Sequence, residues 1–263
     1  MARDARAIGR HLSAPGLALV PVGVGAAYGR PGEAQSCYLV RGGRTAVALD
    51  LGAGALNRLQ DEIAPEDLAA LVITHLHPDH CIDLLSLRVY LAFGSVRAPR
   101  LRVLGPPGLR DRLAAFAGSE GWDEAFAFEE LTGEEGDRDL GGGLTLAYRQ
   151  VPHLPPTFAL RVEGGSAAVC YGADCAPNDA LPQLAAGAGV LVCECSFGAD
   201  EVPEGLPHLN ARQAGEMAAR AGAGRLLLTH CYPEHDRDAA LAAAREAFGG
   251  PVAWAVQGEG VAP

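Results

Sequence analysis

Residues 74–80, Thr-His-Leu-His-Pro-Asp-His, contain three imidazoles and one carboxylate within six consecutive positions. Neutral imidazole nitrogens and carboxylate oxygens are the usual protein ligands of zinc. His75 and His77 alternate along an extended backbone and can point to one side, whereas Asp79 and His80 follow a proline that turns the chain. The spacing therefore predicts two metal sites rather than one. A solvated histidine-rich turn is the alternative, and it is disfavoured because short histidine-rich tracts usually bind metal.

The histidine-rich segment belongs to a wider pattern of strand ends. Its histidines come directly after residues 70–74, whose apolar run predicts a buried strand. Three more metal-competent residues, His153, Asp174 and His230, also end predicted strands. A rigid scaffold commonly holds binding residues in loops of this kind, whereas chance would scatter histidines along the chain. We therefore expect the fold to bring these ends together into a two-metal site, with Asp174 as the carboxylate placed to bridge both ions.

Two earlier segments have a less certain connection with this chemistry. Asp50 closes a predicted hairpin of residues 36–49 beside the expected site. Its carboxylate either orients a metal-binding histidine or serves as a turn residue, and the sequence leaves both interpretations open. The glycine-rich residues 23–29 are disfavoured as a phosphate-binding loop, because no helix follows at once and the dinucleotide-binding spacing is absent.

The whole chain alternates strands with helices and has no obvious internal linker. Strands are predicted over residues 17–24, 36–41, 45–49, 70–74, 100–105, 144–151, 157–162, 167–171, 190–195, 226–229 and 251–256. Helices are predicted over residues 56–63, 82–93, 108–117, 179–186, 210–221 and 236–248. This pattern predicts one α/β domain over residues 1–263, with two sheets between outer helices. The acidic residues 120–143, with interleaved aromatic side chains, are interpreted either as a lid or partner surface or as a solvated connecting segment.

The composition is that of a globular protein with a sizeable core. Of 263 residues, 49% are hydrophobic and 20% are charged. Lys and Arg number 21 against 32 Asp and Glu, which gives a formal net charge of −11. This acidity disfavours a protein that binds long nucleic acids through their phosphates. It is compatible with a small anionic substrate, because bound metal ions reverse the local sign of the charge.

The seven cysteines are odd in number and have no spacing typical of a disulfide-stabilised scaffold. They predict reduced thiols and a cytoplasmic protein, in which most of them are packing residues. The apolar residues 17–24 are too few to span a membrane, and the N-terminus lacks a signal-peptide cleavage pattern. We therefore expect no membrane association.

The histidine-rich motif, followed in order by His153, Asp174 and His230, resembles the metallo-β-lactamase superfamily. Three later segments resemble its ribonuclease Z-like branch of phosphodiesterases. They are residues 193–197, 208–211 and 226–230. The resemblance covers nearly the whole chain and implies an αββα sandwich, in which two mixed β-sheets pack face to face with helices on both outer faces.

The resemblance also implies a dinuclear centre that holds two divalent metal ions, zinc or alternatively manganese. The implied ligands of one metal are His75, His77 and His153. Those of the other are Asp79, His80 and His230, and Asp174 bridges the two. The residues implied in catalysis are Asp79, His208 and Glu194.

In ribonuclease Z-like enzymes a histidine near the leaving group is backed by a glutamate, and His208 and Glu194 match these positions. A hydroxide bridging the two metal ions, oriented in part by Asp79, would attack phosphorus. His208 would then donate a proton to the departing alkoxide, while Glu194 would hold its imidazole in the required tautomer. The match has two departures, because Cys193 stands where the branch often has another histidine and Asn210 stands where threonine is common. A surface-loop histidine is the alternative interpretation of His208.

The resulting hypothesis is a metal-dependent phosphodiesterase that acts on a small phosphodiester or a cyclic nucleotide. An ester, thioester or lactone hydrolase on the same dinuclear site is the main alternative, because the same hydroxide attacks a carbonyl carbon. Processing of tRNA 3′ ends is disfavoured, since residues 154–173 leave room only for a hairpin where tRNA-processing members insert a long arm. A non-catalytic or redox di-iron protein is disfavoured because no attached flavin domain is seen. The resemblance also implies a homodimer. No functional role is predicted for His11 or His235.

Overall fold

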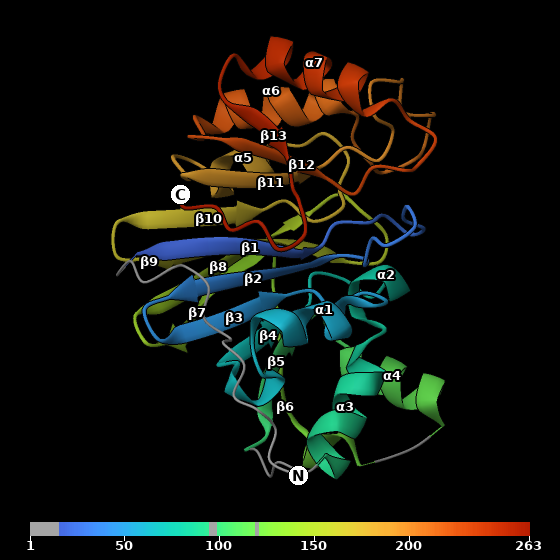
Figure 1. The fold of residues 1–263 in the computed structure, drawn as a ribbon, viewed down its shortest axis with the longest axis vertical. Helices are drawn as coiled ribbons and strands as arrows, with labels where there is room; N and C mark the ends of the chain where they lie inside the picture. The colour runs from blue at the N-terminus through green and yellow to red at the C-terminus, as the bar shows by residue number, and fades with distance from the viewer. Residues whose placement is uncertain (1–15, 95–98, 119–120) are drawn as a thin grey trace.

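Two β-sheets packed face to face form the centre of the molecule (Figure 1). The computed structural model describes residues 16–94, 99–118 and 121–263. The sheets have the strand orders β1-β2-β3-β4-β5-β6 and β13-β12-β11-β10-β9-β8-β7. The strands of the first sheet are β1 Leu17–Gly23, β2 Cys37–Gly42, β3 Thr45–Leu49, β4 Ala70–Val72, β5 Leu101–Gly105 and β6 Phe126–Glu130. Those of the second are β7 Glu135–Gly141, β8 Leu144–Val151, β9 Thr157–Gly164, β10 Ala167–Tyr171, β11 Val190–Glu194, β12 Leu226–Thr229 and β13 Val252–Trp254.

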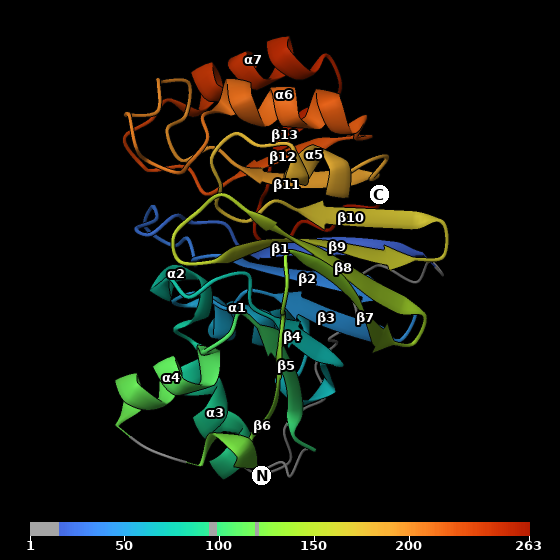
Figure 2. The same cartoon turned by 180° about the vertical axis from the view of Figure 1, so that it is seen from behind.

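Helices flank the two sheets on opposite sides, as Figure 2 shows from behind. On the side of the first sheet lie α1 Ala55–Glu62, α2 Pro78–Cys81, α3 Leu84–Phe93 and α4 Leu109–Ala117. On the side of the second sheet lie α5 Ala180–Leu184, α6 Ala211–Ala221 and α7 Arg237–Phe248. Short 3₁₀ turns occur at Pro65–Asp67 and Trp122–Glu124. The layer order of helices, sheet, sheet and helices confirms the αββα sandwich expected from the sequence.

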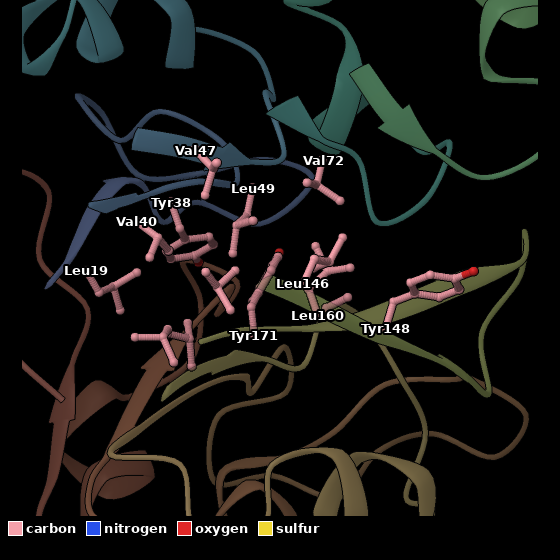
Figure 3. Close-up of a cluster of buried hydrophobic side chains, with 14 of the residues drawn as sticks. Leu19, Tyr38, Val40, Val47, Leu49, Val72, Leu146, Tyr148, Leu160 and Tyr171 are labelled. Carbon is pink, nitrogen blue, oxygen red and sulfur yellow. The ribbon is translucent and has the colours of Figure 1, made fainter. Parts of the chain in front are cut away.

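The strands are apolar on both faces because one face packs in the core between the sheets (Figure 3) and the other packs under the helices. In β2, Tyr38 and Val40 belong to the cluster between the sheets, whereas Cys37 and Leu39 belong to the cluster under the helices. This alternation follows from the pleat of a strand, which points successive side chains to opposite faces. All four side chains are fully buried, so the strand is a continuous apolar run. From the second sheet the core receives, among others, Leu146, Leu160 and Tyr171.

The strands that carry the candidate site residues run in one direction within each sheet. β3, β4 and β5 pair in parallel in the first sheet, and β10 to β13 pair in parallel in the second. β8 is antiparallel to β9, which is antiparallel to β10, so β8 runs with β10. The carboxyl ends of strands that run in the same direction lie at the same edge of a sheet, and the residues that follow them collect there.

The interpretations of the segment 120–143 as a lid and as a solvated connecting segment are wrong, whereas its interpretation as a partner surface stays a prediction. Instead of a lid or a solvated connection, it contains β6 and β7, each an edge strand of its sheet. Trp122 and Phe126 are 1% and 0% exposed, so its aromatic side chains anchor the edge of the first sheet. β7 was hidden by its composition, because its charged side chains face solvent and only Leu140 is buried. Charged residues on an edge strand also discourage pairing with another chain.

The cysteines of the described residues are all buried and form no disulfide, in agreement with the prediction of packing residues. No helix in the described part of the chain is long and apolar enough to cross a membrane. His11 lies outside the described residues.

Candidate metal centre

All seven predicted metal ligands lie together at the carboxyl edge of the sandwich. They come from the segment after β4, from α2, and from the residues that follow β8, β10 and β12. They form two groups that share Asp174, and the candidate ligand atoms within each group lie within 4.8 Å of one another. The first group is His75, His77, His153 and Asp174, and the second group is Asp79, His80, Asp174 and His230. The structure thus brings together every residue of the predicted set, while metal binding itself stays a prediction.

Imidazole nitrogens dominate the first group. His77 Nδ1 lies 3.1 Å from His75 Nε2 and 3.3 Å from His153 Nε2. Burial, together with the neighbouring imidazoles, lowers the pKa of each of the three rings. The rings are therefore neutral at neutral pH, which is the form that binds metal. His153 Nδ1 lies 2.9 Å from the carbonyl oxygen of Pro207, to which it must donate, so Nε2 carries the free lone pair.

The second group combines imidazoles with carboxylates. His230 Nε2 lies 3.2 Å from Asp79 Oδ2 and 3.5 Å from Asp174 Oδ2. Burial works against a charge on His80 and His230, but the nearby carboxylates, Asp174 above all, outweigh it and raise the pKa of both rings. A raised pKa favours the protonated form of each ring, and a metal ion must compete with that proton. Metal affinity at the second group should therefore fall as the pH is lowered.

Two buried atoms at the junction of the groups test whether these residues suit a metal ion. Nε2 of His80 and Oδ1 of Asp174 have no hydrogen-bond partner among the described residues, although they lie 3.4 Å apart. A buried polar atom without a partner costs about 1–3 kcal/mol. Both atoms are ligand atoms of the kind that zinc binds, and a cation between them would satisfy both. The residues present therefore fit a divalent metal ion.

The carboxylate of Asp50 supports the second group from behind. It is fully buried, and its Oδ2 lies 2.7 Å from His80 Nδ1. Tyr171 also donates a hydrogen bond to it, at 3.0 Å. The contact between Asp50 and His80 fixes the ring of His80 so that its Nε2 faces Asp174. Of the two interpretations of Asp50 from the sequence, the structure favours the one in which it orients a candidate ligand.

Strained backbone concentrates at this edge of the sandwich. Asp50, Ala173 and His230 are the non-glycine residues with positive φ in the described chain, at 60°, 53° and 52°. Asp50 and His230 directly follow β3 and β12, and Ala173 precedes Asp174. Each such conformation costs about 1–3 kcal/mol and persists only when the surroundings enforce it, as they do at functional sites.

His208 and Glu194 form the predicted pair beside both groups. The imidazole of His208 lies 5.0 Å from the ring of His153 and 6.2 Å from that of His230, measured between centroids. Its Nδ1 lies 2.9 Å from Glu194 Oε1 and 4.0 Å from Asp174 Oδ2. Burial alone would lower the pKa of His208, but the hydrogen bond and charge of Glu194 raise it to about 9. The ring is therefore a cation at neutral pH, and its side chain is 15% exposed rather than part of an open surface loop.

We expect the imidazole of His208 to titrate near pH 9 in the metal-free protein. Glu194→Gln should lower this pKa, because burial stays while the hydrogen bond and the charge of the Glu194 carboxylate are lost. A pKa raised in the folded state means a stabilising contribution that is complete below pH 6.5 and lost as the pH rises through about 9. At ~1.4 kcal/mol per pH unit, this contribution is about 3 kcal/mol.

NMR titration of histidine-labelled protein measures this pKa, and His208→Gln assigns the signal. A wild-type ring that titrates near 6.5 would contradict the close pairing with Glu194.

Aromatic rings line one side of the centre. Phe197 lies 6.3 Å from the ring of His208 and 6.2 Å from that of Tyr232. Tyr232 stacks on Tyr28 at 4.8 Å, and Tyr28 is 54% exposed although its hydroxyl donates to Glu234. Tyr28 belongs to the glycine-rich segment after β1. That segment therefore contributes an exposed ring that stacks on Tyr232, whose own ring lies 6.5 Å from that of His230.

The remaining sequence expectations have simple structural outcomes. Asn210, which departs from the expected threonine, caps α6 by accepting a hydrogen bond from the backbone N–H of Gln213. Cys193 is fully buried among apolar side chains and joins neither group. His235 pairs with Asp200 at 2.8 Å and also lies outside both groups. Sequence reasoning missed the hydroxyls of Thr74 and Ser196, which lie 3.0 Å from His75 Nδ1 and from His230 Nδ1. Isolated hydroxyl residues have no characteristic spacing that could have predicted these contacts.

A family model described as a β-lactamase superfamily domain matches residues 49–231. The matched segment begins just before Asp50 and ends just after His230, so it contains both groups and the His208–Glu194 pair.

Individual relatives match over most of their length. The Mycobacterium tuberculosis protein Rv1339 is 34% identical over 230 residues, which are 84% of this chain and 83% of the relative. Ribonuclease Z of Mycobacterium bovis is 31% identical over 248 residues, 82% of this chain and 86% of the relative. The crystal structure of the metallo-β-lactamase fold protein YhfI from Bacillus subtilis has a TM-score of 0.84 at 26% identity, and the match covers 93% of this chain and 98% of that one.

Proposed function

The chain belongs to the metallo-β-lactamase superfamily and has its fold, and on that premise we propose that it is a dinuclear metal-dependent phosphodiesterase that acts on a small phosphodiester such as a cyclic nucleotide. The observation that carries the proposal is the position of His208, whose Nδ1 lies 2.9 Å from Glu194 Oε1 and 4.0 Å from Oδ2 of the shared Asp174. An alkoxide that departs from phosphorus needs a proton. Nδ1 of His208 is occupied by Glu194, so Nε2–H is the position from which the proton leaves.

The two groups would hold two divalent ions, zinc or alternatively manganese. Ions bound there would supply Lewis acidity and lower the pKa of a water molecule toward neutrality. The side chains of the protein would position the ions, orient the attacking group and donate the proton. Asp174 would hold both ions at a fixed separation, and the carboxylate of Asp79 would help to orient the attacking group. His208 would protonate the leaving oxygen, and Glu194 would keep its imidazole charged and correctly turned.

A small substrate is favoured by the surroundings of the centre. β9 and β10 form a tight hairpin between His153 and Asp174, so the described chain has no long arm there. The formal net charge of −11 also opposes binding of long nucleic acids. The ring of Tyr28, which is 54% exposed, suits a nucleobase, because bases stack on aromatic side chains in a sequence-tolerant way. A relative named ribonuclease Z supports phosphodiester chemistry, while these features favour a mononucleotide-sized substrate over tRNA.

The test is a comparison of electrophiles with protein reconstituted in zinc or in manganese. We expect turnover of bis-p-nitrophenyl phosphate and of a cyclic nucleotide, and loss of both after chelation of the metal. Protein with Asp174→Asn, purified in the same way, excludes a contaminating enzyme. Hydrolysis of carboxylic esters, thioesters or lactones without turnover of any phosphodiester would reject the proposal in favour of the alternative chemistry.

A further inference from the structure

The hydroxyl of Ser196 occupies a position between the proton donor and the second group. Ser196 follows β11 and is fully buried. Its Oγ lies 2.6 Å from Glu194 Oε2, 3.0 Å from His230 Nδ1 and 3.3 Å from His208 Nδ1. Ser196 therefore contacts a candidate metal ligand, the candidate acid and the carboxylate that holds the acid.

The chemistry of these three partners fixes the direction of the hydrogen bonds. A hydroxyl has one proton to donate and two lone pairs. The carboxylate of Glu194 only accepts, and it is the shortest contact, so Ser196 donates to it. Ser196 must then accept from Nδ1–H of His230. In the neutral imidazole this leaves Nε2 of His230 without a proton, and Nε2 is the atom that faces Asp79 and Asp174.

The other half of the sandwich contains the same arrangement. Asp50 Oδ2 lies 2.8 Å from Thr74 Oγ1, which lies 3.0 Å from His75 Nδ1. In each half, a buried carboxylate at the end of one strand reaches a histidine at the end of the parallel neighbour through a hydroxyl. The repetition indicates a means of presenting imidazoles rather than an isolated contact.

The halves differ in the histidine that each carboxylate holds directly. Asp50 holds His80, which belongs to the second group. Glu194 holds His208, which belongs to neither group. Glu194 therefore has one oxygen on the acid and the other directed through Ser196 toward a ligand.

We propose that Ser196 is a positioning residue of the second metal site: its hydroxyl links Glu194 to His230 and holds this imidazole with Nε2 free for the metal, and the proposal rests on the dinuclear centre proposed above. One carboxylate thereby orients both the proton donor and a metal ligand. Partners behind a ligand of this kind typically change metal affinity about 10–100-fold.

Zinc titration against a chromophoric chelator tests this role without any substrate. Ser196→Ala should raise the Kd of the zinc ion bound by the second group about 10–100-fold. The Kd of the zinc ion bound by the first group should not change. Ser196→Thr retains the hydroxyl and should restore the affinity. The same pair of changes in a His77→Ala background, which removes one ligand of the first group, shows that the weakened ion is the one bound by the second group.

Each outcome bears on one of the two proposals. Two zinc ions bound equally tightly by Ser196→Ala and the wild type would overturn the role of Ser196 while the dinuclear centre stands. Equal weakening in Ser196→Ala and Ser196→Thr would overturn it as well, because the hydroxyl would not be the cause. A wild-type protein that binds no zinc would overturn the centre itself. If Ser196→Ala does not fold, ¹⁵N NMR of the zinc-loaded wild type decides, since a proton on Nε2 of His230 would contradict the proposed tautomer.

Discussion

Asp174→Asn is expected to reduce kcat at least about a hundredfold, because the stabilisation that two cations supply amounts to several kcal/mol. Asp174 is the residue shared by both groups, and each of its oxygens faces a histidine of the second group. An asparagine offers one neutral oxygen and one N–H donor in place of two anionic oxygens. It would therefore place a donor against a metal ligand and lose the bridge between the groups.

Metal content and thermal stability distinguish this effect from a folding defect. The wild type should gain about 4 kcal/mol of stability when free zinc reaches a thousand times its Kd, and Asp174→Asn should gain much less. Asp200→Asn is the matched control, because Asp200 is an exposed carboxylate paired with His235 outside both groups. An Asp174→Asn protein with two tightly bound zinc ions and wild-type kcat would refute the bridging role.

His208→Ala is expected to lower kcat about 10²–10⁴-fold for a cyclic nucleotide, the range typical of a lost general acid. The leaving alkoxide of that substrate cannot depart without a proton. For bis-p-nitrophenyl phosphate we expect a loss below about tenfold, because p-nitrophenolate leaves without help. The contrast between the two substrates is the measurement, and zinc content should not change.

His235→Ala provides the matched control for this prediction. Like His208, His235 packs near Phe197, at 5.9 Å between ring centroids, but it pairs with the exposed Asp200. It should behave as wild type on both substrates. If His208→Ala instead slows both substrates equally, His208 positions the substrate and is not the acid.

Residue types and their order predicted which histidines and carboxylates the structure brings together. Each of His75, His153, Asp174 and His230 follows an apolar run short enough to be a buried strand. That local pattern is enough to predict a rigid support, because strands in such a sandwich end at a shared edge. The expected αββα fold followed from the same alternation and from the family resemblance.

The hydrogen bonds that orient the candidate ligands could not be predicted from residue type and spacing. Thr74 and Ser196 look like ordinary residues in the sequence, and Asp50 had two equal interpretations. Their roles depend on hydrogen bonds between residues that are 24 and 34 positions apart, as in Asp50 to Thr74 and Ser196 to His230. The edge strand β7 was equally hidden, because one buried leucine among charges gives no periodic signal.

The sequence by itself therefore determined which groups could bind metal and which strands would carry them, since both depend on residue type and short-range spacing. Only the tertiary structure decided which ring nitrogen faces which carboxylate, and that Glu194 reaches His208 directly and His230 through Ser196. Those facts depend on the packing of two sheets whose loops are far apart along the chain. Hydrogen bonds only form over about 3 Å, so no pattern along the sequence can specify them.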